Sequence, residues 1–191
     1  MEKQNEGNKI ELNYPEVWKH LGVRCKTLDI SERKPVYEFF KRAFDITASS
    51  IALIVLSWVF AIVAAAIKLE DGGPVLYSQT RVGKDGRFFK MYKFRSMHVD
   101  AERQKKQLLK QNEMDGPVFK MENDPRITKV GSFIRKTSLD ELPQLVNILK
   151  GEMSVVGPRP PIGHEVMQYD EFAMRRLQVK PGLTCYWQCS G

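Results

Sequence analysis

A run of 22 residues without a charged side chain, from Ile46 to Ile67, restricts the folds open to this chain more than any other feature. Between Ile51 and Ile67 the only polar side chain is that of Ser57. As one helix the run would be about 33 Å long, close to the roughly 30 Å hydrocarbon thickness of a bilayer. It lies too far from the N-terminus for a cleavable signal peptide. We therefore predict a membrane-inserted helix, with a buried core helix as the alternative.

Cationic residues flank this run equally and favour neither membrane orientation. Orientation follows the Lys and Arg residues within about 20 positions of each end. Those residues are Arg33, Lys34, Lys41 and Arg42 before the run, and Lys68, Arg81, Lys84 and Arg87 after it. Equal counts suit a segment that enters one leaflet and returns to the same side, which requires a bend near its middle. Ser57 is the candidate, because a serine hydroxyl can bond back to a helix carbonyl. A helix that spans the bilayer is the alternative.

Turn signals and apolar periodicity divide the rest of the sequence into short elements. Lys84–Gly86 separates two β-prone runs and predicts a hairpin with strands over residues 75–79 and 88–94. Apolar residues spaced as on one helix face predict a helix that Gly151 ends. The expected helices cover residues 101–111, 142–150 and 163–178.

The chain has 191 residues, enough for one domain with its own core and too few for two ordinary ones. We predict an α+β fold that is mostly helical, with one N-terminal membrane-inserted, re-entrant helix and a small domain that contains a short β-hairpin. The predicted divisions are an N-terminal tail over 1–40, an interfacial and membrane-inserted helix over 41–69, and the small domain over 70–191. The net charge of +7 favours anionic partners, namely nucleic acid, anionic lipid or phosphate-rich small molecules.

Two adjacent carboxylates, Asp140 and Glu141, precede the helix predicted over 142–150. Ser138 and Glu141 form the Ser-x-x-Glu pattern of a helix capping box, which requires no function. The alternative is a reactive pair. The positive potential of a helix end, with Arg135 just upstream, keeps a carboxylate ionised for work as a nucleophile or metal ligand.

Basic side chains at two places suit an anionic substrate. Pro158 and Pro160 flank Arg159 in a rigid turn, where its guanidinium can bind phosphate oxygens, unless the turn is an ordinary exposed one. Lys93 and Arg95 share one face of the second predicted strand. A nucleic-acid site would also need exposed stacking aromatics and a groove for the backbone. We therefore prefer the interpretation in which the aromatic side chains lie in the core and the cationic face is solvated. The sequence contains no dinucleotide-binding glycine fingerprint and no P-loop.

Seven motifs, taken together and in order, resemble one known family. They are Lys41–Asp45, Gly73–Gly83, Phe89–Met97, Asn123–Thr128, Arg135–Leu145, Leu149–Pro160 and Lys180–Thr184. The chain resembles the bacterial sugar transferase family, the monotopic phosphoglycosyl transferases that begin surface-glycan synthesis. The resemblance covers residues 41–191.

The resemblance implies a reaction and a location. Members of the family move a sugar-1-phosphate from a UDP-sugar to a membrane polyprenyl phosphate, such as undecaprenyl phosphate, and release UMP. This is the first step of surface polysaccharide synthesis. The implied location is the bacterial inner membrane, with the lipid bilayer as a partner and the catalytic domain, residues 70–191, on its cytoplasmic face.

The resemblance also implies site residues. Asp140 matches the aspartate that forms a covalent phosphosugar intermediate, and Glu141 matches the glutamate associated with Mg²⁺. Arg135 and Arg159 match basic positions around the substrate phosphates. The candidate substrate-binding residues are therefore Arg135, Arg159, Lys93, Arg95 and Pro158.

Two departures from the family pattern keep other functions in view. Ser57-Trp58 stands where family members typically have Ser-Pro, and the chain ends at Gly191, where they usually continue into further helices. A catalytically silent, membrane-anchored interaction module or a fragment is the main alternative. A glycosyltransferase that releases a nucleoside diphosphate is the next, and no nucleic-acid partner is expected. The motifs do not distinguish one donor sugar or oligomeric state from another.

Overall fold

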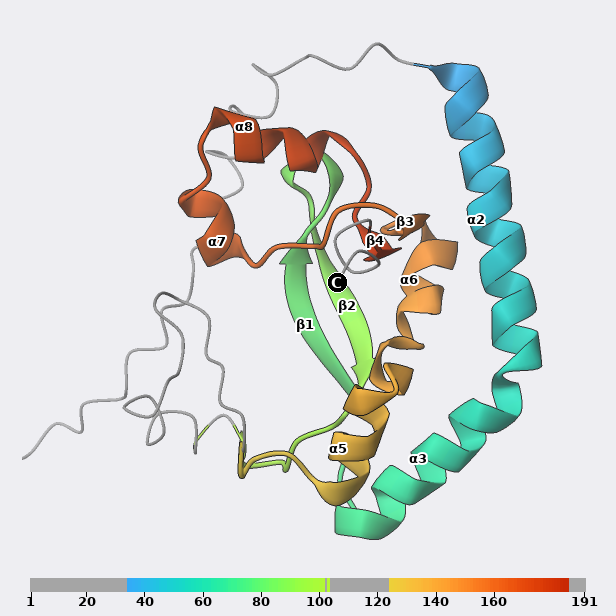
Figure 1. Cartoon of the computed structure of the whole chain (residues 1–191), viewed down its shortest axis with the longest axis vertical. Coiled ribbons are helices and arrows are strands. Elements are labelled where there is room, and N and C mark those ends of the chain that lie inside the picture. Colours follow the sequence, from blue (N-terminus) through green and yellow to red (C-terminus); the bar gives the residue numbers. More distant parts are fainter. Residues whose placement is uncertain (1–33, 102, 104–123, 186–191) are drawn as a thin grey trace, which may run out of the picture.

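A bent pair of helices, a two-stranded hairpin and several short helices make up the described part of the chain (Figure 1). The computed structural model describes residues 34–101, 103 and 124–185. Most of the tail predicted over 1–40 and most of the helix predicted over 101–111 lie outside these residues. The fold class is confirmed in its main features, because the described residues are mostly helical with a small antiparallel strand pair.

The long apolar segment folds as two helices, α2 (Pro35–Val55) and α3 (Ser57–Asp71). Their axes differ by 60°, so the predicted bend near the middle is confirmed. The break lies at Leu56, and Ser57 is the first residue of α3. Among the described residues no single helix has the length and apolarity to cross a bilayer, whereas the bent pair together meets this test of length and composition.

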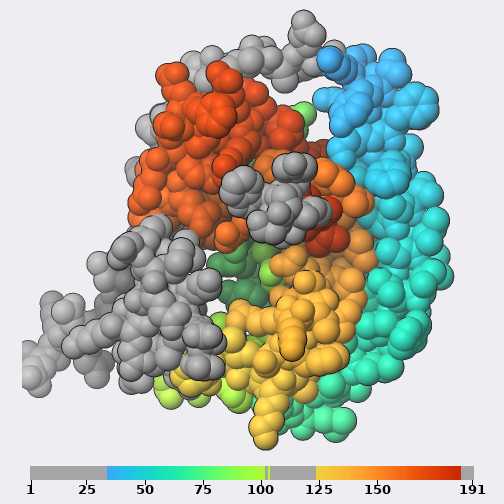
Figure 2. Space-filling view, in the orientation of Figure 1, coloured from blue at the N-terminus to red at the C-terminus, as the bar shows by residue number. Residues whose placement is uncertain are grey.

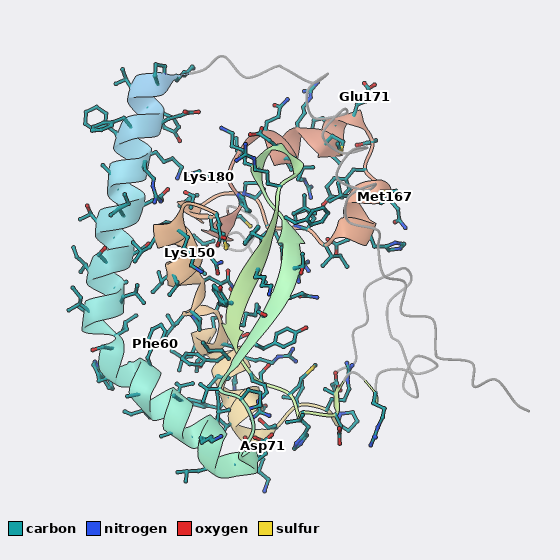
Figure 3. All side chains as sticks on the ribbon, turned by 180° about the vertical axis from the view of Figure 1, so that it is seen from behind. Phe60, Asp71, Lys150, Met167, Glu171 and Lys180 are labelled. Carbon is teal, nitrogen blue, oxygen red and sulfur yellow. The ribbon has the colours of Figure 1, made fainter. Side chains whose placement is uncertain are left out.

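The inner side of the bent pair packs on the domain. Val63 and Ile67 of α3 are 5% and 3% exposed and join Phe94 and Ile134 in one apolar cluster. The Phe60 ring lies 5.3 Å from the Phe94 ring, and Figure 3 shows Phe60 on the side of α3 that faces the hairpin. Because this apolar surface is removed from water, α3 is fixed against the domain.

The outer side of the bent pair is apolar and exposed. In the space-filling view α2 and α3 form a band along one side of the molecule (Figure 2). Its large apolar side chains that are more than half exposed are Val36, Tyr37, Phe39, Phe40, Phe44, Ile51, Ile54, Val55, Trp58, Ile62 and Leu69. Large exposed apolar side chains gathered on two helices are typical of contact with a membrane or with another protein.

Polar contacts tie both arms of the bent pair to helices of the domain. Arg42 of α2 donates to two backbone carbonyl oxygens in the last turn of α6 (Gln144–Lys150), at 2.6 and 2.7 Å. Glu70 of α3 accepts from the first backbone N–H groups of α5 (Lys129–Lys136), the shorter bond at 2.7 Å. Each contact satisfies groups that a helix end leaves without an intrahelical partner.

The predicted hairpin is confirmed. β1 (Leu76–Val82) pairs antiparallel with β2 (Phe88–Phe94), and the turn between them is a short 3₁₀ element, η1 (Lys84–Gly86). Asp85 and Gly86 have φ values of 57° and 74°, in the left-handed region that aspartate tolerates and glycine favours. The turn residues therefore reverse the chain as the sequence indicates.

Helix α6 packs on β2 and completes its outer edge. The prediction that Gly151 ends this helix is confirmed, since it adopts the left-handed conformation with φ 82°. Asn147 of α6 is fully buried. Its Oδ1 accepts from the Tyr92 N–H at 3.0 Å, and its Nδ2 donates to the Lys90 carbonyl and to Glu152 Oε2, each at 2.7 Å. One side chain thus takes the place of a neighbouring strand.

The helical stretch predicted over residues 163–178 is confirmed in kind, but it is interrupted and not one continuous helix. Asp170 interrupts the segment, because its side chain accepts from the Ala173 N–H at 2.7 Å and begins a new helix. The segment consists of α7 (Gly163–Met167), α8 (Glu171–Met174) and the 3₁₀ turn η4 (Arg175–Gln178).

Two three-residue strands were not predicted. β3 (Ser154–Val156) pairs in parallel with β4 (Gly182–Thr184). The buried carboxylate of Asp45, on α2, accepts from the Ser154 hydroxyl and from the Val155 N–H, each at 3.0 Å. The strand that leads into the Gly-Pro-Arg-Pro turn is therefore attached directly to α2.

Candidate active site

The adjacent carboxylates lie on a tight turn between α5 and α6. The 3₁₀ element η3 (Leu139–Glu141) contains both Asp140 and Glu141. Ser138 has φ 58°, a left-handed conformation that is uncommon for residues other than glycine, and its side chain caps no helix. The predicted capping box of Ser138 and Glu141 is therefore wrong, and the Glu141 side chain is available to other groups.

Lys93 of β2 binds this pair of carboxylates. Its Nζ lies 2.7 Å from Glu141 Oε1 and 3.6 Å from Asp140 Oδ2. Asp140 is only 7% exposed. Burial raises the pKa of the Asp140 carboxyl, Lys93 acts against this rise, Glu141 adds to it, and Arg135 opposes it. A buried carboxylate with a raised pKa beside an ammonium group is a feature of reactive sites.

The structure brings some of the predicted substrate-binding residues to the dyad and leaves one apart. Lys93 contacts both carboxylates, and Arg135, exposed at the end of α5, acts electrostatically on Asp140. Arg95 is buried instead in an ion pair with Asp71 at the end of α3. The strand alternation that puts Arg95 on the face of Lys93 does not hold, because β2 ends at Phe94.

The Gly-Pro-Arg-Pro turn is held by the β3–β4 pair. The Gly157 N–H donates to the Thr184 carbonyl at 3.0 Å, and the Pro158 carbonyl accepts from the Gly182 N–H at 2.9 Å. A Cβ atom at Gly182 would collide with the backbone of Gly157, so only glycine allows this close approach. The β3–β4 pair therefore fixes both ends of the turn, which presents Arg159 as an exposed side chain.

Sequence reasoning missed Arg81, which joins β1 to this turn. Its Nη1 donates to the Pro160 carbonyl at 3.1 Å, and its Nη2 donates to Gln79 Oε1 at 2.7 Å. Arg159 and Glu141 both act electrostatically on its guanidinium. No sequence signal marked it, because the strand predicted over residues 75–79 ends before Arg81, whereas β1 extends to Val82.

A hollow of about 330 Å³ runs beside β1 and the start of α7. Its lining residues are Tyr77, Ser78, Gln79, Thr80, Phe88, Ile162, Gly163 and His164. No carboxylate of the dyad lines it. The candidate reactive centre is the Lys93, Asp140 and Glu141 cluster, and Gln79, which lines the hollow, accepts a bond from Arg81.

The chemistry of the dyad fits Mg²⁺ in one particular way. Among the described residues no group of three or more His, Cys, Asp or Glu side chains is arranged to hold a metal. Mg²⁺ is often bound by one or two carboxylates together with substrate phosphates, and it keeps several waters. Asp140 and Glu141 supply two such carboxylates, so the dyad suits an ion shared with a phosphate-bearing substrate and not a metal site built from protein alone.

Comparison with known proteins gives one family and several relatives. The model of the family "Bacterial sugar transferase" matches residues 36–191. The chain is 55% identical over 151 residues to "Galactosyl transferase CpsE" of Streptococcus agalactiae, covering 79% of this chain and 33% of that protein. It is 44% identical over 162 residues to "Exopolysaccharide production protein ExoY" of Rhizobium meliloti, covering 83% and 72%. It is 48% identical over 160 residues to "Undecaprenyl-phosphate galactose phosphotransferase" of Salmonella typhimurium, covering 80% and 33%. The chain thus spans about a third of the length of the first and third of these relatives.

Proposed function

The chain belongs to the bacterial sugar transferase family, and we propose that it transfers a sugar-1-phosphate from a UDP-sugar to a polyprenyl phosphate. The names of relatives as undecaprenyl-phosphate sugar phosphotransferases and exopolysaccharide production proteins support this reaction. The observation that carries the proposal is the buried Asp140, held beside Glu141 and Lys93 on a turn of fixed geometry. The product would be the first lipid-linked unit of a surface polysaccharide.

In the first proposed step, an Asp140 carboxylate oxygen attacks the phosphorus that carries the sugar. The new bond joins this oxygen to phosphorus, and the bond from phosphorus to the bridging oxygen breaks. The electron pair stays on that oxygen, which leaves as part of UMP. Lys93 contacts both carboxylates, so in this step it would offset the charge that gathers around the attacked phosphoryl group.

In the second proposed step, a phosphate oxygen of the polyprenyl phosphate attacks the same phosphorus. The acyl phosphate bond to Asp140 breaks, the carboxylate is restored, and the product is polyprenyl diphosphate sugar. A covalent intermediate lets a water-soluble donor and a lipid acceptor use one site in turn. The exposed side chains of Arg135 and Arg159 suit the phosphates of substrates that arrive from solution.

Mg²⁺ belongs to the proposal as an ion shared by Glu141, Asp140 and the donor phosphates. When bound, it would neutralise phosphate charge and polarise the phosphorus–oxygen bonds. Lys93 lies 2.7 Å from Glu141 Oε1 and so orients a carboxylate that would hold the ion.

We further propose that the bent pair α2–α3 inserts into the cytoplasmic leaflet of the bacterial inner membrane and places the dyad at its surface. Three features support this: the exposed apolar outer side, the 60° bend, and equal cationic flanks. A segment that enters and leaves on one side would set the catalytic domain beside the head group of the lipid acceptor.

Product analysis tests the proposed function. Purified chain in nanodiscs, supplied with Mg²⁺, undecaprenyl phosphate and a panel of UDP-sugars, should release UMP with at least one donor. It should also form a lipid product that carries the sugar phosphate. Release of UDP instead would mean that sugar is transferred without phosphate, and the proposed mechanism would be wrong.

Replacing Glu141 with glutamine tests the role of Mg²⁺. We expect the transfer rate to fall by roughly 10- to 1,000-fold, and more Mg²⁺ to restore only part of it, because a carboxylate ligand is lost. The measurement is UMP release against Mg²⁺ concentration. Glu171→Gln, at an exposed position on α8 (Figure 3), is the matched control and should leave the rate and the Mg²⁺ dependence unchanged. An unchanged Mg²⁺ dependence in Glu141→Gln would argue against the metal role.

A further inference from the structure

One face of the hairpin runs from the dyad to the Gly-Pro-Arg-Pro turn. In the antiparallel register Tyr77 lies opposite Lys93, and Arg81 lies opposite Phe89. Residues opposite each other share a face, and residues two apart on a strand do the same. Tyr77, Gln79 and Arg81 therefore lie on the face of Lys93, whose ammonium group binds the dyad.

The surroundings of Arg81 are unusual for a structural arginine. Its guanidinium is partly buried and makes two hydrogen bonds, both to neutral oxygens, on Pro160 and Gln79. Its Nε is buried and has no hydrogen-bond partner among the described residues. Within the same residues no carboxylate oxygen lies within 4.0 Å of it, although Glu141 and Glu165 act on it from farther away.

Burying a guanidinium without a paired carboxylate costs folding free energy, and a second cation adds to this cost. Burial and then the charge of Arg159 lower the pKa of Arg81, because both disfavour its charged form. Arg81 bonds to the carbonyl of Pro160, which follows Arg159 in the chain, so two cationic side chains meet at this turn and Arg81 has no paired carboxylate among the described residues, which disfavours the folded chain. Their arrangement becomes favourable when an anion with several oxygens lies between them, since arginine binds phosphate through two parallel N–H bonds.

We propose that Arg81 binds the diphosphate of the sugar nucleotide together with Arg159, at the phosphate that leaves with the nucleoside. This inference rests on the proposed function and names a further substrate-binding residue for it. Arg81 is four residues along β1 from Tyr77, the partner of Lys93, or about 13 Å of strand. Of the two cationic side chains on the hairpin, Arg81 therefore starts farther from Asp140, so we place it at the phosphate that leaves with the nucleoside and gains negative charge as the bridging bond breaks. The hollow beside Tyr77–Thr80, which Gln79 also lines, suits the nucleoside.

Binding of UDP tests this assignment, because UDP carries no sugar and cannot be turned over. In nanodiscs, measured by calorimetry, Arg81→Gln should raise the Kd for UDP at least tenfold. Arg87→Gln, the same change at an exposed position of the hairpin turn, should leave the Kd within twofold of the unchanged chain. Competition by uridine, which has no phosphate, should be equal in the unchanged chain and in Arg81→Gln.

Three outcomes would overturn the assignment. The first is UDP binding by folded Arg81→Gln that equals that of the unchanged chain. The second is an equal loss of UDP and uridine binding, which would give Arg81 a structural role only. If Arg81→Gln does not fold, Arg81→Lys replaces it and should weaken UDP binding at least threefold, because lysine cannot bind bidentately. The third outcome is that Arg81→Lys binds UDP as tightly as the unchanged chain.

The proposed function is judged separately from this assignment. If the unchanged chain releases UMP while Arg81→Gln binds UDP normally, only the assignment fails. If the unchanged chain releases no UMP from any UDP-sugar, the proposed function fails and the assignment fails with it.

Discussion

Replacing Asp140 with asparagine should lower UMP release at least about 1,000-fold and abolish the covalent adduct, because an amide cannot serve as the attacking nucleophile. The change keeps the size of the side chain and alters only its charge and one acceptor atom. The measurements are UMP release under saturating donor and intact mass after incubation with donor alone. A variant that still forms the phosphosugar adduct would remove Asp140 from the role of nucleophile.

The same substitution should not destabilise the fold. The pKa of Asp140 is raised in the folded chain, so at pH values above that pKa its ionised form costs folding free energy. Asparagine removes this cost, and the Tm of Asp140→Asn at neutral pH should equal or exceed that of the unchanged chain. The difference should shrink once pH falls below the raised pKa and disappear below the ordinary pKa of aspartate, where the carboxyl is protonated in both states.

Asp85→Asn is the matched control for both measurements. Asp85 is exposed in the hairpin turn and has φ 57°, a conformation that asparagine also adopts readily. We expect normal UMP release and an unchanged Tm. A loss of activity in this control would show that the assay responds to any change of net charge.

Replacing Asn147 with leucine should lower the free energy of unfolding by about 2–4 kcal/mol, the largest effect on stability that we predict. The Tyr92 N–H and the Lys90 carbonyl lose the partner that completes the edge of β2, and Glu152 loses a donor. The leucine side chain supplies none of these bonds. Thermal unfolding in detergent should show a Tm lower by roughly 5–15 °C.

The control for Asn147→Leu is Gln168→Leu, another exchange of an amide for leucine. Gln168 is exposed on the surface, and its side-chain amide lies 3.3 Å from the His164 ring. Its replacement should change the free energy of unfolding by less than about 0.5 kcal/mol. Equal Tm values for the two variants would mean that Asn147 does not stabilise β2.

The elements predicted correctly are those that local chemistry determines. The Lys84–Gly86 turn needs residues that accept positive φ, and aspartate and glycine provide it. Gly151 ends α6 for the same reason, with φ 82°. The bend of the apolar segment was predicted from balanced flanking charge, and it lies at Leu56, next to the expected Ser57.

The errors arise where distant segments decide the outcome. Ser138 and Glu141 have the spacing of a capping box, but the left-handed Ser138 turns the chain before α6 and Lys93 takes Glu141 instead. Arg95 lies past the end of β2, where Asp71 of α3 pairs with it. No local pattern indicates either partner.

The strands β3 and β4 show the same limit. Each has three residues, too few for a period-two pattern, and Ser154 finds its partner Gly182 far along the chain. The dyad could be proposed from its motif, whereas the arginine of β1 could not. Arg81 has significance only because the Pro160 carbonyl and Arg159 lie beside it in the folded chain.

The turn η3, which contains the dyad, lies between α5 and α6. The start of α5 and the end of α6 each bond to a different helix of the bent pair. Glu70 holds the start of α5, and Arg42 holds the end of α6. These two attachment points lie on opposite sides of the break at Leu56. A change in the angle at this break would alter the separation of the two attachments, and only a short connection that includes η3 joins the two helices. The angle between α2 and α3 therefore bears on the geometry of the candidate active site, although the break at Leu56 lies outside η3.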